Sequence, residues 1–296
     1  MTKIKTIGCI GLGTMGKPIA AHLLKSGFSV SGYARRDTFF EEEGADLIAQ
    51  GMNIASNPAE LASGAELVIT NVLSGDDVAD VLLNRDDAVI HGAKPDLIVM
   101  DHSTIAPQQA QNIYQRLKAS QIGFVDAPVS GGGAGAKAGT LVAMLGGDPE
   151  DVASLFSVLS CYTNGFRHIG GSGHGQVAKL CNQIAQVVTI SGVSEAMRFA
   201  AIHDTDQNAV LDVMMQGFAS SKMLELMAPK MISDDYTPGM ESRLHAKDMG
   251  IALAAAQKYE ADFPATALVS GLLDEIQKAG WQNRDTSILY HYLKNI

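Results

Sequence analysis

The sequence is poor in cysteine and has no pattern that would join its cysteines. The three, Cys9, Cys161 and Cys181, lie far apart and form no CxxC pair, so we expect no disulfide framework and a reducing compartment. The eight histidines form no HxH or HxxxH pair. Because metal-binding histidines usually occur in such patterns, we expect no metal site.

Charged residues are also scarce. They make up 18% of the 296 residues, and acidic ones predominate, giving a net charge of −10. That sign disfavours a nucleic-acid partner. The longest apolar region, 175–203, contains Lys179, Glu195 and Arg198, so it predicts no membrane span. Glycines interrupt the N-terminal apolar stretch, which therefore does not resemble a signal peptide, and we expect a cytoplasmic protein.

Strand signals are missing after about residue 170. Before that point, short apolar runs alternate with helical patterns, which predicts a doubly wound parallel sheet of the α/β class. After it, only helical spacing is found. We therefore predict a Rossmann-type dinucleotide-binding domain over residues 1–168 and an all-helical substrate and oligomerisation domain over 169–296. A long helix over about 175–203 would join them.

The first strand and helix enclose a glycine motif. Residues 6–10 read as a buried strand, residues 18–26 as a helix, and between them stands Gly11-Leu12-Gly13-Thr14-Met15-Gly16. In this context GxGxxG predicts a dinucleotide site, with one glycine for the turn, one for pyrophosphate approach and one for close packing. The alternative is a glycine-rich turn without a ligand.

The end of the second expected strand distinguishes the two nicotinamide cofactors. An acidic residue there would hold the ribose hydroxyls of NAD, but the chain has Ala34 followed by Arg35 and Arg36. Paired guanidinium groups suit a 2′-phosphate, so we predict NADP(H), with NAD possible. Asp37 could instead reach the ribose, and the arginines could be solvated loop residues.

Further ligand contacts are expected where other strands end, because open α/β sheets bind ligands at that edge. Leu73, Ser74 and Thr104 are predicted to contact the cofactor. The run Asp126–Gly133 offers free backbone N–H groups that suit a small carboxylate. The alternative for this run is a flexible hinge.

The long helix carries the predicted chemistry. Its apolar residues fall nearly all round the helical wheel, so we expect it to be buried on most sides. Lys179, Asn182, Gln183 and Gln186 share one face. Burial lowers the pKa of a lysine ammonium towards the range useful for acid–base catalysis. A lysine that extends to the surface is the alternative.

Taken together, the chain resembles the β-hydroxyacid dehydrogenases, a family that includes 3-hydroxyisobutyrate dehydrogenase and tartronate semialdehyde reductase. The resemblance rests on motifs in order along nearly the whole chain: GLGTMGKPIA, DHSTIAP, DAPVSGGGAGAKAGTL, GHGQVAKLCNQ and HAKDMGIAL. It implies hydride transfer between NADP(H) and a small 3-hydroxy acid or its semialdehyde.

The resemblance also implies residue roles. Lys179 would be the general acid and base. The substrate carboxylate would bind Ser103, Ser130, Gly131 and Gly132, and Asn182 would orient the substrate. Lys247, with Asp248 as its orienting partner, would contact the cofactor. A homodimer or homotetramer is expected.

The chain departs from the family pattern at His102, which we interpret as a solvated neighbour of Asp101. Imine reductases share the architecture, but they usually replace the catalytic lysine, which is present here as Lys179. A non-catalytic dinucleotide-binding relative is the remaining alternative. Phe218, Met240 and Trp281 are candidates for substrate selectivity, although core or interface positions suit them better.

Overall fold

The computed structural model describes residues 4–295, without the side chain of Asp37. The chain divides into two compact units, Met1–Lys179 and Leu180–Ile296. No helix of the described residues is long and apolar enough to cross a membrane.

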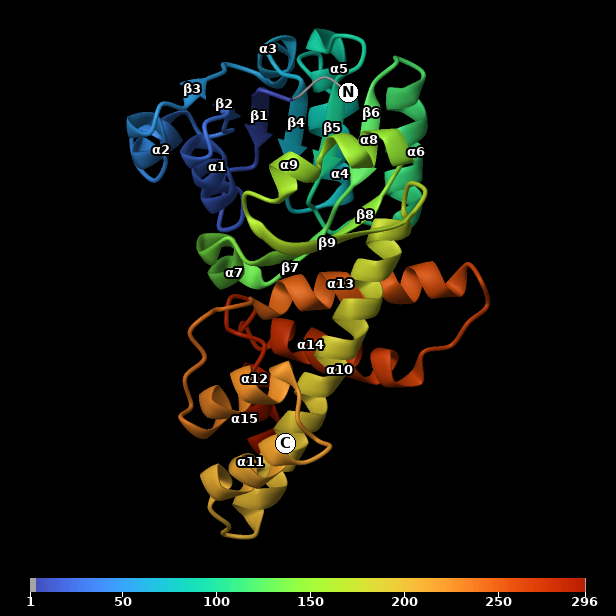
Figure 1. Ribbon diagram of the computed structural model, residues 1–296. Coiled ribbons are helices and arrows are strands. Elements are labelled where there is room, and N and C mark those ends of the chain that lie inside the picture. Colours follow the sequence, from blue (N-terminus) through green and yellow to red (C-terminus); the bar gives the residue numbers. More distant parts are fainter. Residues whose placement is uncertain (1–3, 296) are drawn as a thin grey trace. The chain divides into compact units, whose positions relative to one another are not determined.

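The first unit is an α/β layer structure around one sheet (Figure 1). Its strands are β1 (Thr6–Ile10), β2 (Ser29–Tyr33), β3 (Asn53–Ile54), β4 (Leu67–Thr70), β5 (Ile98–Asp101), β6 (Gly123–Asp126), β7 (Val129–Ser130), β8 (Leu141–Gly146) and β9 (Thr163–Gly170). Its helical segments are α1 (Gly16–Lys25), η1 (Asp37–Phe40), α2 (Ala45–Ala49), α3 (Pro58–Ser63), α4 (Gly75–Ala79), η2 (Asp80–Asn84), α5 (Val89–Gly92), α6 (Pro107–Lys118), α7 (Gly132–Ala138), α8 (Pro149–Ser154) and α9 (Phe156–Leu159).

The strand order is β3-β2-β1-β4-β5-β6-β8-β7, and β9 pairs with β8. The strands from β3 to β6 are parallel, which confirms the expected doubly wound fold class. Beyond β6 the sheet is mixed, because β8 runs antiparallel to both β6 and β7. The chain turns back directly after β7 through the short helix α7, so no crossover separates β7 from β8.

Alternate residues of the strands face two separate cores. Ile7, Ile69 and Met100 belong to one core, which α1, α2, α8 and α9 cover. Val68 and Val99 belong to the other, which α3, α4, η2, α5 and α6 cover. Side chains of successive strand residues point to opposite faces, so apolar strands with two covered faces become buried throughout.

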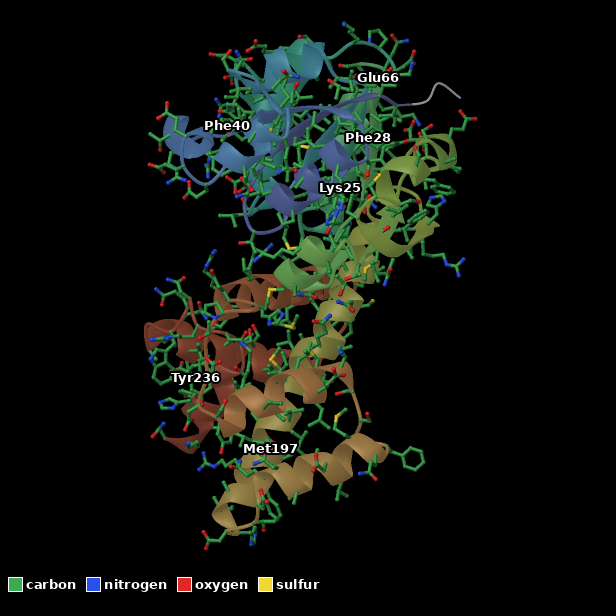
Figure 2. All side chains as sticks on the ribbon, turned by 60° about the vertical axis from the view of Figure 1, so that its left-hand side comes forward. Lys25, Phe28, Phe40, Glu66, Met197 and Tyr236 are labelled. Carbon is green, nitrogen blue, oxygen red and sulfur yellow. The ribbon has the colours of Figure 1, made fainter. Side chains whose placement is uncertain are left out.

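The second unit is helical. The long helix α10 (His174–Ile202) enters it and is followed by α11 (Gln207–Gln216), α12 (Lys222–Ile232), α13 (Ser242–Gln257), α14 (Pro264–Lys278) and α15 (Ile288–Lys294). Its apolar residues form two clusters, one around Val187 and Leu273 and one around Met197 and Met231. Met197 is fully buried in the second cluster (Figure 2).

Helix α10 has one exposed stripe, and its other sides are buried or half-buried. Val177 is 45% exposed and Phe199 is 65% exposed, whereas Val187, Ile190 and Met197 are fully buried. The exposed positions recur at helical spacing along one side, and the remaining positions of the helix are buried or half-buried. The expectation of a helix buried on most sides is therefore confirmed.

Candidate functional site

The turn between β1 and α1 has the geometry that a dinucleotide requires. Gly11 has a φ of +87°, and a Cβ there would lie 2.2 Å from the Asn71 carbonyl oxygen. A Cβ on Gly16 would lie 2.0 Å from the Gly11 carbonyl oxygen. A Cβ on Gly13 would meet no atom within 4 Å, so that backbone is open to a ligand. The three glycines therefore suit the turn, the helix packing and the pyrophosphate approach respectively.

The sheet edge beside this turn carries a side-chain donor without a hydrogen-bond partner. The Asn71 side chain follows β4 beside this turn, and its Nδ2 atom has no hydrogen-bond partner. Ser74 is not equally available, because its Oγ accepts from the Asp77 N–H at 3.1 Å and caps α4. Leu73 is 54% exposed, and Thr104 is partly buried. Residues of this edge can therefore hold a dinucleotide, with Ser74 acting mainly through the helix that it caps.

The glycine loop after β6 lies against the same turn. Ser130 belongs to β7 and pairs with Val142 of β8, and α7 begins at Gly132. Gly131 and Gly132 have φ values of +132° and +60°. A Cβ on Gly133 would lie 2.9 Å from the Thr14 methyl group. The loop therefore forms a strand-to-helix turn, and it adjoins the candidate dinucleotide site.

Lys179 lies beside this loop. The residue is only 6% exposed, and its Nζ donates a hydrogen bond of 2.9 Å to the Val129 carbonyl oxygen. Val129 directly precedes Ser130, so the amine is held next to the predicted carboxylate-binding residues. The alternative of a lysine that extends to the surface does not hold.

Asp126 fixes the start of the helix that carries Lys179. Its two carboxylate oxygens accept from the Gly173 N–H at 2.7 Å and the Gln176 N–H at 2.9 Å. A carboxylate at a helix N-terminus satisfies donors that have no partner within the helix. Burial, aided by the Asp101 charge, raises the pKa of the Asp126 carboxyl to about 7. Asp126 lies within the segment predicted to bind a carboxylate, but this role was not predicted from the sequence.

Gln176 joins α10 to the segment after β5. Its Nε2 donates to the Ser103 carbonyl oxygen at 2.9 Å, and its Oε1 accepts from the Ile105 N–H at 3.1 Å. The Ser103 Oγ accepts from the Val72 N–H at 2.9 Å. This role of Gln176 was not predicted, and its place in the GHGQVAK motif is the one signal in the sequence that points to it.

The interpretation of His102 as a solvated residue was wrong. His102 is 3% exposed, its Nδ1 donates to the Ala127 carbonyl oxygen at 2.6 Å, and its Nε2 lies 3.0 Å from the Tyr162 hydroxyl. Burial lowers the pKa of this imidazole to about 4, so the ring is neutral near pH 7. His102 therefore links the ends of β5 and β6 as a structural residue.

The two arginines after β2 differ in their surroundings. The Arg36 guanidinium forms ion pairs with Glu42 and Glu43. Arg35 is largely exposed, and its guanidinium lies 3.8 Å from the Asp77 carboxylate. The Asp37 side chain, which the NAD alternative needs, lies outside the described side chains.

The helical unit holds a second polar group of the predicted residues. Asn182 donates to Gln183 at 3.1 Å, Gln183 donates to Asp248 at 2.7 Å, and Asp248 forms a 3.2 Å ion pair with Lys247.

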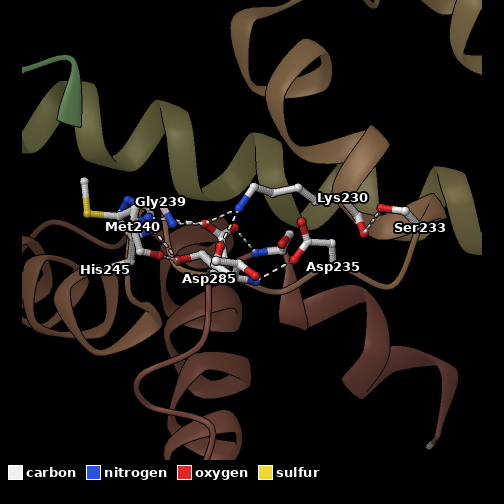
Figure 3. Close-up of polar contacts among 10 residues, drawn as sticks. Lys230, Ser233, Asp235, Gly239, Met240, His245 and Asp285 are labelled. Carbon is white, nitrogen blue, oxygen red and sulfur yellow. Dashed lines mark hydrogen bonds and ion pairs between the residues drawn. The ribbon is translucent and has the colours of Figure 1, made fainter. Parts of the chain in front are cut away.

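The start of α13 is held by Asp285, whose carboxylate accepts from the N–H groups of Gly239 and Met240 and from Lys230 (Figure 3).

The structure does not bring the candidates for substrate selectivity together. Phe218 is fully exposed between α11 and α12. Trp281 packs on the cluster around Val187 and contacts the His291 ring. Over residues 4–295, no group of His, Cys, Asp or Glu side chains is arranged to hold a metal ion.

Comparison with known proteins agrees with these features. Residues 6–170 match the family model described as the NAD-binding domain of 6-phosphogluconate dehydrogenase. Residues 173–293 match the model described as NAD-binding of NADP-dependent 3-hydroxyisobutyrate dehydrogenase.

Individual relatives match over most of their length. A 3-hydroxyisobutyrate dehydrogenase of Pseudomonas aeruginosa is 34% identical over 90% of this chain and 90% of its own. An NAD-dependent L-serine dehydrogenase of the same organism is 32% identical over 97% of each chain. The structure of a Mycobacterium tuberculosis 3-hydroxyisobutyrate dehydrogenase with L-serine has a TM-score of 0.88 at 27% identity, covering 98% of this chain and 99% of that one. The chain belongs to the β-hydroxyacid dehydrogenase family, and its cofactor is a nicotinamide dinucleotide.

Proposed function

We propose that this member of the β-hydroxyacid dehydrogenase family transfers a hydride between NADP(H) and a short 3-hydroxy acid or its semialdehyde, with Lys179 as general acid and base. The observation that carries the proposal is the position of Lys179. Its amine is buried and hydrogen-bonded to the residue before Ser130, beside the glycine loop that adjoins the dinucleotide turn.

In the reductive direction, the Lys179 ammonium donates its proton to the carbonyl oxygen of the substrate. In the oxidative direction, the neutral amine removes the proton of the hydroxyl group. The bound nicotinamide supplies or accepts the hydride. Ser130, Gly131, Gly132 and Ser103 bind the carboxylate, which holds the reacting carbon near Lys179. Asn182 orients the substrate.

The cofactor is held mainly by the turn Gly11–Gly16, together with Leu73, Ser74, Thr104 and Lys247. For the choice of NADP(H), Arg35 is the stronger of the two arginines. Its guanidinium is largely exposed, whereas Arg36 is engaged with Glu42 and Glu43. The absence of an acidic side chain at Ala34 also favours a 2′-phosphate over free ribose hydroxyls.

The cofactor proposal is tested by replacing Arg35 with serine. We expect the KM for NADPH to rise by about tenfold, because one charge-assisted hydrogen bond to the phosphate is lost. The KM for NADH should stay unchanged. Arg36→Ser is the matched control, and a larger effect there than at Arg35 would contradict the assignment.

The relatives support a class of substrate rather than one particular acid. 3-Hydroxyisobutyrate and L-serine, named in the relatives, share a carboxylate and a hydroxyl group on the third carbon. Oxidation rates with these two acids, and reduction rates with tartronate semialdehyde, succinic semialdehyde and glyoxylate, test the proposal. Turnover of at least one acid, dependent on its carboxylate, supports it. If none reacts although the cofactor binds, the proposed function is wrong.

The proposal includes self-association. Large apolar side chains stand exposed on the helical unit, among them Phe199 at 65%, Val213 at 71% and the fully exposed Phe218. Such surfaces are often covered in oligomers. Light scattering should therefore give a mass of two or four chains, and a monomer mass would contradict this part.

A further inference from the structure

The side-chain amide of Gln176 makes two hydrogen bonds to one short stretch of backbone. Nε2 donates to the Ser103 carbonyl oxygen at 2.9 Å, and Oε1 accepts from the Ile105 N–H at 3.1 Å. The side chain is fully buried. Both the donor and the acceptor of the amide are therefore used. Replacing such a buried amide is costly, because the backbone groups that it bonds would be left buried without these hydrogen bonds.

The stretch that Gln176 holds carries two predicted ligand contacts. Ser103 is expected to bind the substrate carboxylate, and Thr104, between the two bonded residues, is expected to contact the cofactor. The segment has a second tie, because the Ser103 Oγ accepts from the Val72 N–H at 2.9 Å. Gln176 therefore holds the backbone while Val72 holds the Ser103 hydroxyl.

Gln176 is also fixed to the helix that carries the predicted acid–base residue. It stands three residues before Lys179 in α10, which places the two on neighbouring positions of one helix face. The Gln176 N–H donates to Asp126 at 2.9 Å. A continuous set of hydrogen bonds thus runs from the end of β6, through the first turn of α10, to the segment after β5.

We propose that Gln176 is a positioning residue that keeps Ser103 and Thr104 in register with Lys179. The proposal rests on the proposed function for the roles of those three residues, but its physical content is the restraint on the 103–105 backbone. Only a side chain with one donor and one acceptor can supply both bonds. A methionine supplies neither, and an ionised carboxylate places negative charge against the Ser103 carbonyl oxygen.

Gln176→Met and Gln176→Glu test the proposal, with Gln115→Glu on the exposed face of α6 as the charge-matched control. The first readout needs no turnover. In Gln176→Met, hydrogen–deuterium exchange at the Ile105 amide should become at least about tenfold faster, because its acceptor is gone. The dissociation constant of NADPH, from fluorescence titration, should rise by about tenfold.

The second readout is pH dependence in Gln176→Glu. The Asp126 carboxylate accepts from the N–H of residue 176 itself, and the Asp101 carboxylate accepts from the N–H of Ser103, to which the introduced carboxyl would be bonded. Lys179 stands three residues further along α10, and the neutral His102 directly precedes Ser103. Burial and the two carboxylates raise the pKa of such a carboxyl. Its protonated form can donate to Ser103 and its ionised form cannot, so NADPH affinity should fall as pH rises through that pKa. A purely structural loss would weaken binding equally at each pH.

The outcomes separate this inference from the proposed function. Unchanged Ile105 exchange and wild-type NADPH affinity in Gln176→Met would overturn the positioning role, even if the enzyme turns over hydroxy acids. Faster exchange and weaker binding would support it even if no acid in the panel reacts. If Gln176→Met fails to fold, the pH-dependent affinity of Gln176→Glu, absent from Gln115→Glu, decides, and a profile equal to that of wild type would refute the proposal.

Discussion

The substitution Gly13→Ala should separate cofactor binding from folding. A methyl group at Gly13 would meet no atom within 4 Å, and the residue has no positive φ that would strain an alanine. Replacing such a glycine stabilises the folded state by about 0.4–1 kcal/mol, because the unfolded chain loses freedom. The same methyl group would occupy the space through which the pyrophosphate approaches the backbone.

The expected loss of affinity follows from the contacts that the methyl group blocks. One charge-assisted hydrogen bond between a backbone N–H and a phosphate is worth about 1.5–3 kcal/mol, so the Kd for NADPH should rise by about 10- to 100-fold. In contrast, Gly16→Ala would place its Cβ 2.0 Å from the Gly11 carbonyl oxygen. Because backbone must move, we expect about 1–3 kcal/mol of destabilisation.

Urea unfolding and fluorescence titration with NADPH measure the two effects separately. Gly64→Ala is the matched control, since its Cβ would also meet no atom within 4 Å and its φ is −101°, but it lies at the end of α3. It should leave the Kd unchanged. If Gly13→Ala binds NADPH as tightly as wild type, the assignment of this turn to the pyrophosphate is wrong.

Two buried groups give opposite dependences of stability on pH. The pKa of Asp126 is raised to about 7 in the fold, so its contribution to stability is lost as pH rises from about 4 to about 7. The pKa of His102 is lowered to about 4, so its contribution is lost as pH falls from about 6.5 to about 4. Between pH 7 and 5 each effect amounts to at most about 2 kcal/mol, because one unit of pKa shift corresponds to about 1.4 kcal/mol. On acidification from pH 7 to 5, Asp126→Asn should therefore lose free energy of unfolding and His102→Phe should gain it, each by up to about 2 kcal/mol relative to the change in wild type. Urea unfolding at the two pH values checks both variants, and a variant that follows the wild-type pH dependence would show that its residue does not titrate as described.

Much of the fold could be predicted because its signals are local. The strand Thr6–Ile10 has the predicted bounds, since an apolar run followed by the glycine motif marks it in the sequence itself. The reversal of β8 could not be predicted in the same way. It depends on how β8 pairs with β6 and β7, which no short pattern records.

In the candidate site, too, local features could be predicted and contacts between distant residues could not. Lys179 was identified because a lysine on an apolar helix is conspicuous in sequence. The burial of His102 was missed because its partner Tyr162 lies 60 positions away. The bonds of Gln176 were missed for a similar reason, since their partners Ser103 and Ile105 lie more than 70 positions earlier in the sequence.

The most direct test of the central claim is the turnover of Lys179→Met beside wild type, with the acid that wild type oxidises fastest. Lys222→Met, at an exposed lysine of α12, is the control. We expect Lys179→Met to bind NADPH with wild-type affinity and to lose at least about 100-fold in kcat, because general acid–base catalysis typically contributes that much. Near-normal turnover by Lys179→Met would contradict the assignment of Lys179 as the acid and base.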